Sequence, residues 1–405
     1  MTEETDRRLA HLESQVELLT RLLGAQANGS AHAVVPDLSA ALVDAVQALA
    51  PLQAFLDDDT VSDILINGAG AIYVESSGKL QLTGMRFPTD AKVFSIAESI
   101  AAQAGRHIPE GRPLVDARLP DGSRVNIIAP PLAVDGTAIS IRKFTKHAIT
   151  LDVMAKQGNV SPSLADFLKI CSRCRLNVIV SGGTGSGKTT LLNALSEHID
   201  LDERIVTIED AAELRLRQPH VVRLETRPAN TSTGEDEVSI RELVRNALRM
   251  RPDRILVGEV RGAEAFDMLQ AMNTGHEGSL TTIHANHPRD ALARLENMLT
   301  MANLNLPNQA IRTQIASAVH LVVQTSRMRD GVRRVTYVSE VVGMESDIIT
   351  MQELFSFQTK GEDAEGKLIG EFKWSGIMPR FLRRVAYYGE AERMSRALGV
   401  KLPKM

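Results

Sequence analysis

The segment Gly182-Gly183-Thr184-Gly185-Ser186-Gly187-Lys188-Thr189 has residue types and a spacing that suit phosphate chemistry. It matches the pattern G-x-x-x-x-G-K-[ST], in which closely spaced glycines let several backbone N–H groups point at one phosphate. Lys188 is a candidate catalytic residue that would neutralise the charge of the β- and γ-phosphate oxygens. The Thr189 hydroxyl would bind Mg²⁺. The sequence therefore predicts a site for ATP and Mg²⁺ formed by Gly182, Gly183, Thr184, Gly185, Ser186, Gly187, Lys188, Thr189 and Thr190.

Two other apolar runs end near acidic residues. Residues 204–208 lead into Glu209, and residues 254–257 lead through one glycine into Glu259, where an Asp directly after the run would be usual. Hydrolysis of a nucleotide needs a carboxylate near the metal and a group that orients the attacking water. We expect Glu209 and Glu259 to fill these catalytic roles, with Glu259 held to Mg²⁺ through water. The alternative is a pair of solvated acids at strand ends, and the pattern does not distinguish which Glu polarises the water.

Two histidines, His276 and His284, flank the predicted strand 279–283. A zinc site would need H-x-x-x-H spacing or nearby cysteines to complete four ligands, and neither is present in this stretch. The pair is better interpreted as polar groups that sense the nucleotide from a neighbouring strand. Ordinary core or surface histidines are the alternative.

These candidate residues need a scaffold that brings strand ends together. From residue 163 onward the sequence predicts helices that alternate with strands, which is typical of a parallel sheet with helices on both faces. The carboxyl ends of parallel strands meet at one edge of such a sheet, and ligands bind there. The predicted helices are 163–171, 188–199, 240–250, 263–273 and 289–302, and the predicted strands are 177–180, 204–208, 220–224, 254–257 and 279–283.

The remaining chain divides into further regions. Residues 50–143 contain short strands, one helix near 90–104 and a hairpin turn, which predicts an α+β domain. Residues 144–162 are rich in polar and turn residues and are expected to be a linker. Residues 1–49 are expected to be a helical segment, and residues 163–405 a P-loop domain with a mostly parallel sheet, a β-rich part and a helical tail. The predicted fold class is α/β.

Composition excludes several classes of protein. Among 405 residues, 46 Lys and Arg stand against 50 Asp and Glu, so bulk charge does not indicate a nucleic-acid partner. Aromatic residues make up 4% of the chain, which argues against a stacking surface for single strands. An acidic N-terminus and the lack of a long apolar run predict a cytoplasmic protein. The two cysteines, Cys171 and Cys174, fit a reducing compartment and are expected to be buried thiols.

The phosphate loop, the acidic residues and the histidine segment occur in the order found in the type II/type IV secretion traffic ATPases, which this chain resembles over residues 50–345. Three longer blocks are similar to the CpaF-type ATPases of tight-adherence (Flp) pili: residues 116–124, 243–262 and 340–345. The resemblance implies a RecA-like C-terminal domain on which an N-terminal domain closes. It also implies a homo-hexameric ATP-driven motor, peripheral at the cytoplasmic face of the inner membrane, that acts through a platform protein and so on pilin indirectly.

The resemblance also assigns roles to individual residues. Glu209 and Glu259 would serve hydrolysis, and His276 and His284 would serve nucleotide sensing. Arginines would stabilise charge from the N-terminal domain or from a neighbouring subunit, and the matching residues here are Arg118, Arg124, Arg142 and Arg245. Each of these arginines could instead be a structural surface residue. The chain departs from its relatives at residues 230–237, where they carry a short basic or Gly-rich loop.

Two other functions remain open at this point. One is a nucleotide-dependent scaffold, or the ATPase of a related secretion system. The other is a nucleic-acid translocase, which the charge balance and low aromatic content disfavour.

Overall fold

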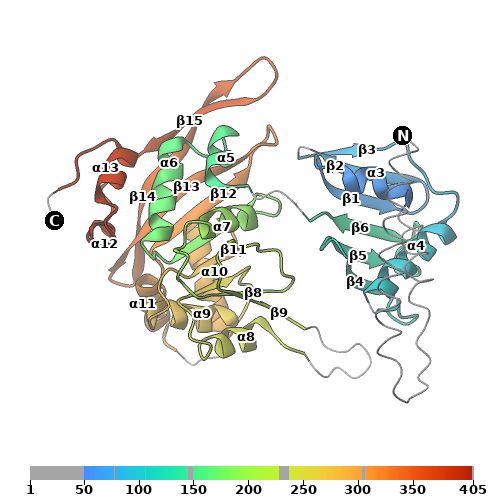
Figure 1. The fold of residues 1–405 in the computed structure, drawn as a ribbon, viewed down its shortest axis with the longest axis horizontal. Coiled ribbons are helices and arrows are strands. Elements are labelled where there is room, and N and C mark those ends of the chain that lie inside the picture. The colour runs from blue at the N-terminus through green and yellow to red at the C-terminus, as the bar shows by residue number, and fades with distance from the viewer. Residues whose placement is uncertain are drawn as a thin grey trace. The chain divides into compact units, whose positions relative to one another are not determined.

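The structure is a computed structural model, and it describes residues 50–403 except 77, 105, 145–148, 228–236 and 303–305. The chain forms two compact units, Met1–Lys146 and His147–Met405 (Figure 1). The predicted helical segment 1–49 lies outside the described residues, as does the departing loop 230–237 except for its last residue.

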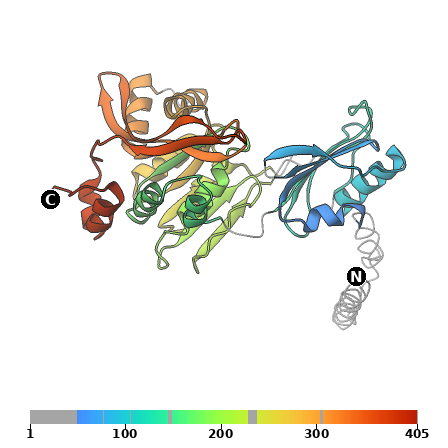
Figure 2. The ribbon, with the colours of Figure 1, turned by 90° about the horizontal axis from the view of Figure 1, so that it is seen from above.

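Unit 1 contains, within its described part, a six-stranded antiparallel sheet in the order β3-β2-β1-β6-β5-β4. Alternate strand residues are buried, and helix α4 packs its apolar side against that face (Figure 2). The Thr89 hydroxyl caps α4 by accepting a hydrogen bond from the backbone N–H of Lys92. The elements are η1 Ala50–Leu52, α3 Gln53–Asp57, β1 Val61–Asn67, β2 Ala71–Ser76, β3 Lys79–Leu82, α4 Asp90–Gln103, β4 Leu114–Arg118, β5 Arg124–Ile128 and β6 Ala138–Arg142.

Unit 2 contains, within its described part, a nine-stranded sheet in the order β15-β14-β13-β12-β7-β11-β10-β8-β9. The strands from β12 to β9 in this order are parallel, and β13, β14 and β15 add an antiparallel extension. The strands are β7 Val178–Gly182, β8 Ile205–Glu209, β9 Val221–Glu225, β10 Arg254–Val257, β11 Leu280–His284, β12 Leu321–Arg327, β13 Arg333–Glu345, β14 Ile348–Glu362 and β15 Leu368–Trp374. The predicted α/β fold with a mostly parallel sheet is confirmed.

Helices cover both faces of the unit 2 sheet (Figure 1). In the central strand β7, Val178 and Val180 face a core shared with α5, α6, α7, α12 and α13, whereas Ile179 faces a core shared with α8 to α11. A strand that is apolar on both faces is typical of a sheet buried between two helical layers. The helices are α5 Leu151–Lys156, α6 Pro162–Arg173, α7 Lys188–Ser196, α8 Ile240–Ala247, α9 Glu264–Asn273, α10 Pro288–Met301, α11 Asn308–Ala318, α12 Leu382–Tyr387 and α13 Ala391–Leu398.

The structure differs from the sequence prediction in two helices. The predicted linker 144–162 includes α5, whose Leu151 and Met154 are buried in the unit 2 core, so the linker prediction is wrong for this stretch. Its polar residues are explained by capping, because the Thr150 hydroxyl accepts a hydrogen bond from the Val153 N–H. Helix α11 was not predicted; its Ile311 and Ile315 pack into the other core. Cys171 and Cys174 are both buried free thiols.

Candidate nucleotide site

The phosphate loop connects β7 to α7, and glycine is required at several of its positions. Gly185 and Gly187 have φ angles of +68° and +95°, which L-residues with a Cβ rarely adopt. Gly182 has no room for a side chain, because a Cβ there would lie 2.4 Å from the Ser186 Oγ and 2.5 Å from the Thr325 carbonyl oxygen. The glycines of the G-x-x-x-x-G-K-[ST] pattern are therefore needed for the backbone conformation and the close packing of this loop.

Strand β12 fixes the loop from one side. Thr325 is the register partner of Gly182, and its Oγ1 donates to the Ser181 carbonyl at 3.2 Å and lies 2.9 Å from the Ser186 Oγ. Ser186 Oγ also donates to the Gly183 carbonyl at 2.9 Å. Thr325 was not singled out in the sequence, although the polar pair Gln324-Thr325 follows an apolar run as the candidate acids do.

Lys188 and His284 meet at the carboxyl edge of the sheet. The buried Lys188 donates from Nζ to the Gly183 carbonyl at 3.0 Å and lies 3.4 Å from Nε2 of His284, whose register partner is Gly182. Burial, together with the positive charge of Lys188, lowers the pKa of His284. A neutral imidazole can accept a hydrogen bond from the Lys188 ammonium at Nε2, and that nitrogen then has no proton to donate to another group.

Glu259 follows β10 and lies next to the same histidine. Its Oε1 is 3.2 Å from His284 Nε2, yet this buried oxygen accepts no hydrogen bond from the residues that the structure describes. Its Oε2 accepts a hydrogen bond from Arg261 at 2.8 Å. A buried carboxylate oxygen without a donor is suited to a water molecule or a metal-bound water. Arg261 was not singled out in the sequence.

Glu209 ends the neighbouring strand β8 and is almost fully buried. Burial raises the pKa of this carboxyl to about 7, although it accepts hydrogen bonds from the backbone N–H groups of Glu213 and Leu214 at 3.0 Å. A Cβ on Gly258 would lie 2.9 Å from the Glu209 Cγ. The absence of an Asp at position 258 is thus explained, because the Glu209 side chain occupies that space.

The residues present fit a bound Mg²⁺. Thr189 stands half-buried at the start of α7, and Glu259 offers the unpaired oxygen. The described residues contain no group of three His, Cys, Asp or Glu side chains that could hold a metal by themselves. Mg²⁺ usually has few protein ligands, with phosphate oxygens and waters completing its shell.

The comparison with known families places this site in a class of proteins. The family described as Type II/IV secretion system protein matches residues 45–353. This chain belongs to that family. It is an ATPase of the secretion and pilus ATPase superfamily.

Two relatives are similar to this chain in sequence, and one solved structure shares its fold. A Mycobacterium tuberculosis protein named for conjugal transfer is 40% identical over 294 residues, which cover 71% of this chain and 83% of that protein. The type IV secretion system protein PtlH of Bordetella pertussis is 37% identical over 326 residues, covering 74% of this chain and 94% of its own. The pilus retraction motor PilT with bound ADP shares the fold, with a TM-score of 0.52, 18% identity and coverage of 88% and 90%.

The secretion ATPase does not bring all predicted residues to the phosphate loop. His276 precedes β11 and therefore lies at the amino end of the strand whose carboxyl end carries His284. A five-residue strand spans roughly 15 Å, so within this chain the structure does not bring His276 to the phosphate loop beside His284. Arg245 is exposed on α8, a helix that packs against β8 and α9.

Three predicted arginines form a row in unit 1. Arg118 and Arg124 are register partners across β4 and β5, and Arg124 and Arg142 are partners across β5 and β6. Directly paired residues project from the same face of a sheet, and this is the face opposite α4. Arg142 also donates a hydrogen bond from Nε to the Asp63 carboxylate on the next strand, β1, at 3.1 Å. We name Arg118, Arg124 and Arg142 the arginine row.

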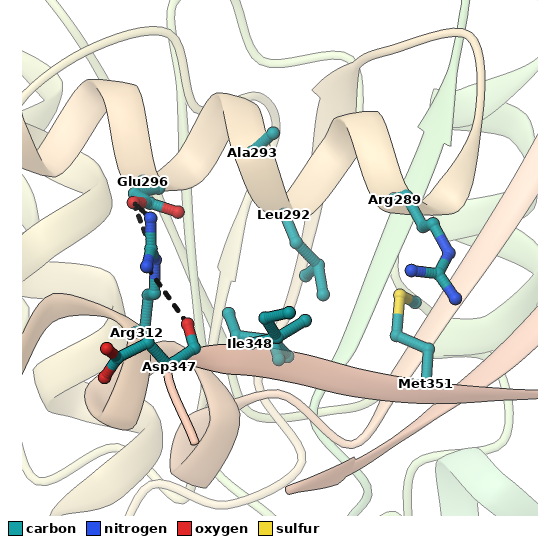
Figure 3. A pocket seen from close by; sticks show the side chains of 9 residues that line it. Arg289, Leu292, Ala293, Glu296, Arg312, Asp347, Ile348 and Met351 are labelled. Carbon is teal, nitrogen blue, oxygen red and sulfur yellow. Dashed lines mark hydrogen bonds and ion pairs between the residues drawn. The ribbon is translucent and has the colours of Figure 1, made fainter. Parts of the chain in front are cut away.

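A separate hollow of about 250 Å³ lies between α10 and the β13–β14 turn (Figure 3). Arg312 crosses one end, where it donates to Glu296 at 2.9 Å and to the Asp347 carbonyl at 3.0 Å. Leu292, Ile348 and Met351 line its apolar part. None of the predicted nucleotide residues lines this hollow.

Among the residues that the structure describes, no helix combines the length and the apolar content that crossing a bilayer requires.

Proposed function

We propose that this secretion ATPase is the motor of a tight-adherence (Flp) pilus. It would act as a homo-hexamer at the cytoplasmic face of the inner membrane, on a platform protein and so indirectly on pilin. The proposal is supported by the similarity of residues 116–124, 243–262 and 340–345 to CpaF-type ATPases. The net charge of −4 gives no reason to expect a nucleic-acid substrate.

The observation that carries ATP hydrolysis is the convergence of Lys188, His284 and Glu259 at the carboxyl edge of the sheet. Lys188 binds the β- and γ-phosphate oxygens once nucleotide replaces the Gly183 carbonyl as its acceptor. Glu259 orients the attacking water with its unpaired Oε1. Mg²⁺, held by the Thr189 hydroxyl and phosphate oxygens, would supply further positive charge at the developing negative charge.

Glu209 has a different role in this proposal. Both of its oxygens accept backbone N–H groups of the 213–214 segment, and its Cγ packs across Gly258. It is therefore a positioning residue, because it holds the end of β10 and hence Glu259 in place. A pKa of about 7 also lets it exchange a proton near neutral pH.

The arginine row would complete the site in the assembled ring. Arginines stabilise transition-state charge in phosphoryl transfer, either from the same chain or from a neighbour. Three of them are neighbours in register on one face of the unit 1 sheet. By family resemblance, Arg245 would likewise stabilise charge, and His276 would take part in nucleotide sensing.

The test of the motor is steady-state phosphate release by the full chain across protein concentration, with the mass of the assembly measured in parallel. We expect turnover to rise as a six-subunit particle forms and to vanish in Glu259→Gln, while Glu345→Gln, an exposed acid at the end of β13, keeps it. Equal activity of the monomer would overturn the ring. Tight nucleotide binding without phosphate release would instead support a nucleotide-dependent scaffold.

A second candidate is the ATPase of a related type IV secretion system. The names of the Mycobacterium tuberculosis and Bordetella pertussis relatives favour it. Deletion of the gene in the source bacterium, with complementation by wild type or Lys188→Ala, separates the two. Loss of surface pili that only wild type restores supports the pilus motor, whereas intact pili with a defect in transfer or secretion supports the alternative.

A further inference from the structure

The β12–β13 hairpin borders the phosphate loop on the side away from the catalytic acids. Strand β7 lies between β11 and β12 in the sheet. His284 ends β11, and Glu259 follows β10 on the far side of β11, so the proposed site places the transferred phosphate on that side. If the γ-phosphate of a nucleotide reacts on that side, the other phosphates and the nucleoside must lie elsewhere along the loop. The β12–β13 hairpin forms the opposite side of the loop.

The hairpin is held rigidly. Arg334 makes two hydrogen bonds to Asp330, at 2.9 and 2.8 Å, and both side chains are about 5% exposed or less. Asp330 also accepts the backbone N–H groups of Val332 and Leu368 at 3.1 and 3.0 Å. These donors hold the pKa of Asp330 down at about 2. The turn therefore presents the side chains beside it in a defined position.

Two arginines flank this turn and approach the loop. Arg327 and Arg333 are register partners at the closed end of the hairpin, on either side of the turn 328–332. Arg333 donates from Nε to the Gly185 carbonyl at 2.9 Å, and its Cδ is 3.4 Å from where a Cβ on Gly187 would be. The Nη1 of Arg327 would lie 3.9 Å from a Cβ on Gly185. Both guanidinium groups thus lie against the tip of the phosphate loop.

The Arg333 contact orients a peptide group. In a trans peptide the carbonyl and the following N–H point in opposite directions. Holding the Gly185 carbonyl outward turns the Ser186 N–H inward, where it donates to the Gly183 carbonyl at 3.3 Å. Ser186 Oγ and Lys188 Nζ donate to the same carbonyl oxygen, at 2.9 and 3.0 Å. Donors for phosphate are therefore gathered inside the loop while Arg333 holds its outside.

We propose that Arg327 and Arg333 form a second, cis-acting nucleotide subsite that takes the diphosphate common to ATP and ADP. Arg333 is a positioning residue that holds the loop open for phosphate. Arg327 binds the phosphates that are not transferred, as a guanidinium does through charge-assisted hydrogen bonds. The inference rests on the proposed ATPase site and extends it to this hairpin. Because these contacts are equal in the ground and transition states, they set KM more than kcat.

The test measures binding of ADP and of a non-hydrolysable ATP analogue to the full chain by calorimetry, with KM and kcat from phosphate release. For Arg327→Ala and Arg333→Ala we expect at least tenfold weaker binding of both nucleotides. KM should rise by a similar factor, and kcat should stay within about threefold for Arg327→Ala. The control is Arg329→Ala on the same hairpin, an exposed arginine that pairs with Glu362. It should bind both nucleotides as wild type does.

Several outcomes would overturn the proposal. Binding of both nucleotides within twofold of wild type in both variants would remove the subsite. A loss confined to the ATP analogue would assign these arginines to the transferred phosphate instead. Arg333→Lys keeps the charge but not the planar guanidinium, so full rescue by lysine would contradict the positioning role. Lys188→Ala separates this inference from the proposed function: unchanged ADP binding there would overturn the nucleotide site itself.

Discussion

The phosphate loop of unit 2 and the arginine row of unit 1 both position positive charge, but they do so in different ways. Lys188 is 8% exposed and donates a hydrogen bond to the Gly183 carbonyl of the loop. Arg142 has a side chain that is 60% exposed, and its ion pair with Asp63 lies on an open sheet face. A buried, hydrogen-bonded group is preorganised, whereas an exposed ion pair contributes little to stability and can exchange partners. We infer that unit 2 provides the fixed chemistry and unit 1 an adjustable surface.

The largest expected effect is the loss of the fixed group. Lys188→Ala should lower the rate of phosphate release at least hundredfold, because a buried charge at the transferred phosphate supplies about 3 kcal/mol or more to the transition state. Steady-state turnover of the full chain measures it. The matched control is Lys360→Ala, whose exposed side chain on β14 pairs with Glu371. Turnover within tenfold of wild type in Lys188→Ala would contradict the preorganised site.

The second prediction concerns stability as a function of pH. Glu209 has a pKa of about 7 in the folded chain, above the usual 4.5, so the folded state binds the extra proton between these values. Stability is then lost as the pH rises through about 7. Glu209→Gln cannot ionise and should raise the free energy of unfolding at pH 8, by up to about 3 kcal/mol, with little change at pH 5.

Urea unfolding of unit 2 in wild type and in Glu209→Gln, at pH 5 and at pH 8, measures the change in the free energy of unfolding. Glu98→Gln, an exposed acid on α4 of unit 1, is the control and should leave the stability of unit 2 unchanged at both values. An equal gain at both pH values would show that burial of Glu209 does not carry the effect.

The third prediction tests the adjustable surface. Arg142→Ala should lower turnover of the assembled protein about tenfold, the equivalent of about 1.4 kcal/mol, because it removes one charge from the arginine row. The free energy of unfolding should change by less than about 1 kcal/mol, as is usual for an exposed ion pair. Lys79→Ala, an exposed cation on the far edge strand of the same sheet, should leave turnover unchanged. Loss of stability with intact turnover would make the row structural.

The smallest effect distinguishes the two histidines. His284→Ala should lower turnover about fivefold, since His284 contacts Lys188 and Glu259, while His276→Ala should stay within twofold in the same assay. A larger loss in His276→Ala than in His284→Ala would show that His276 acts through contacts that one chain does not contain.

Local patterns were sufficient to predict the elements of this site. Gly182 to Thr189 specify a loop between a strand and a helix because the backbone angles and the close approach at Gly182 exclude other residues. Glu209 and Glu259 could be predicted for a similar reason, since parallel strands deliver their carboxyl ends to one edge. The linker prediction failed at α5 because caps and turns are similar in composition, and only the packing of Leu151 separates them.

The sequence by itself therefore determined the class of fold, the phosphate loop and the acids at the ends of β8 and β10. Only the tertiary structure decided that β12 lies beside β7, which places Thr325, Arg327 and Arg333 against the loop. The pairing of β4, β5 and β6 also brought the arginine row into register. The physical reason is that these contacts join residues distant in the chain, whereas patterns of charge and hydrophobicity report only on near neighbours.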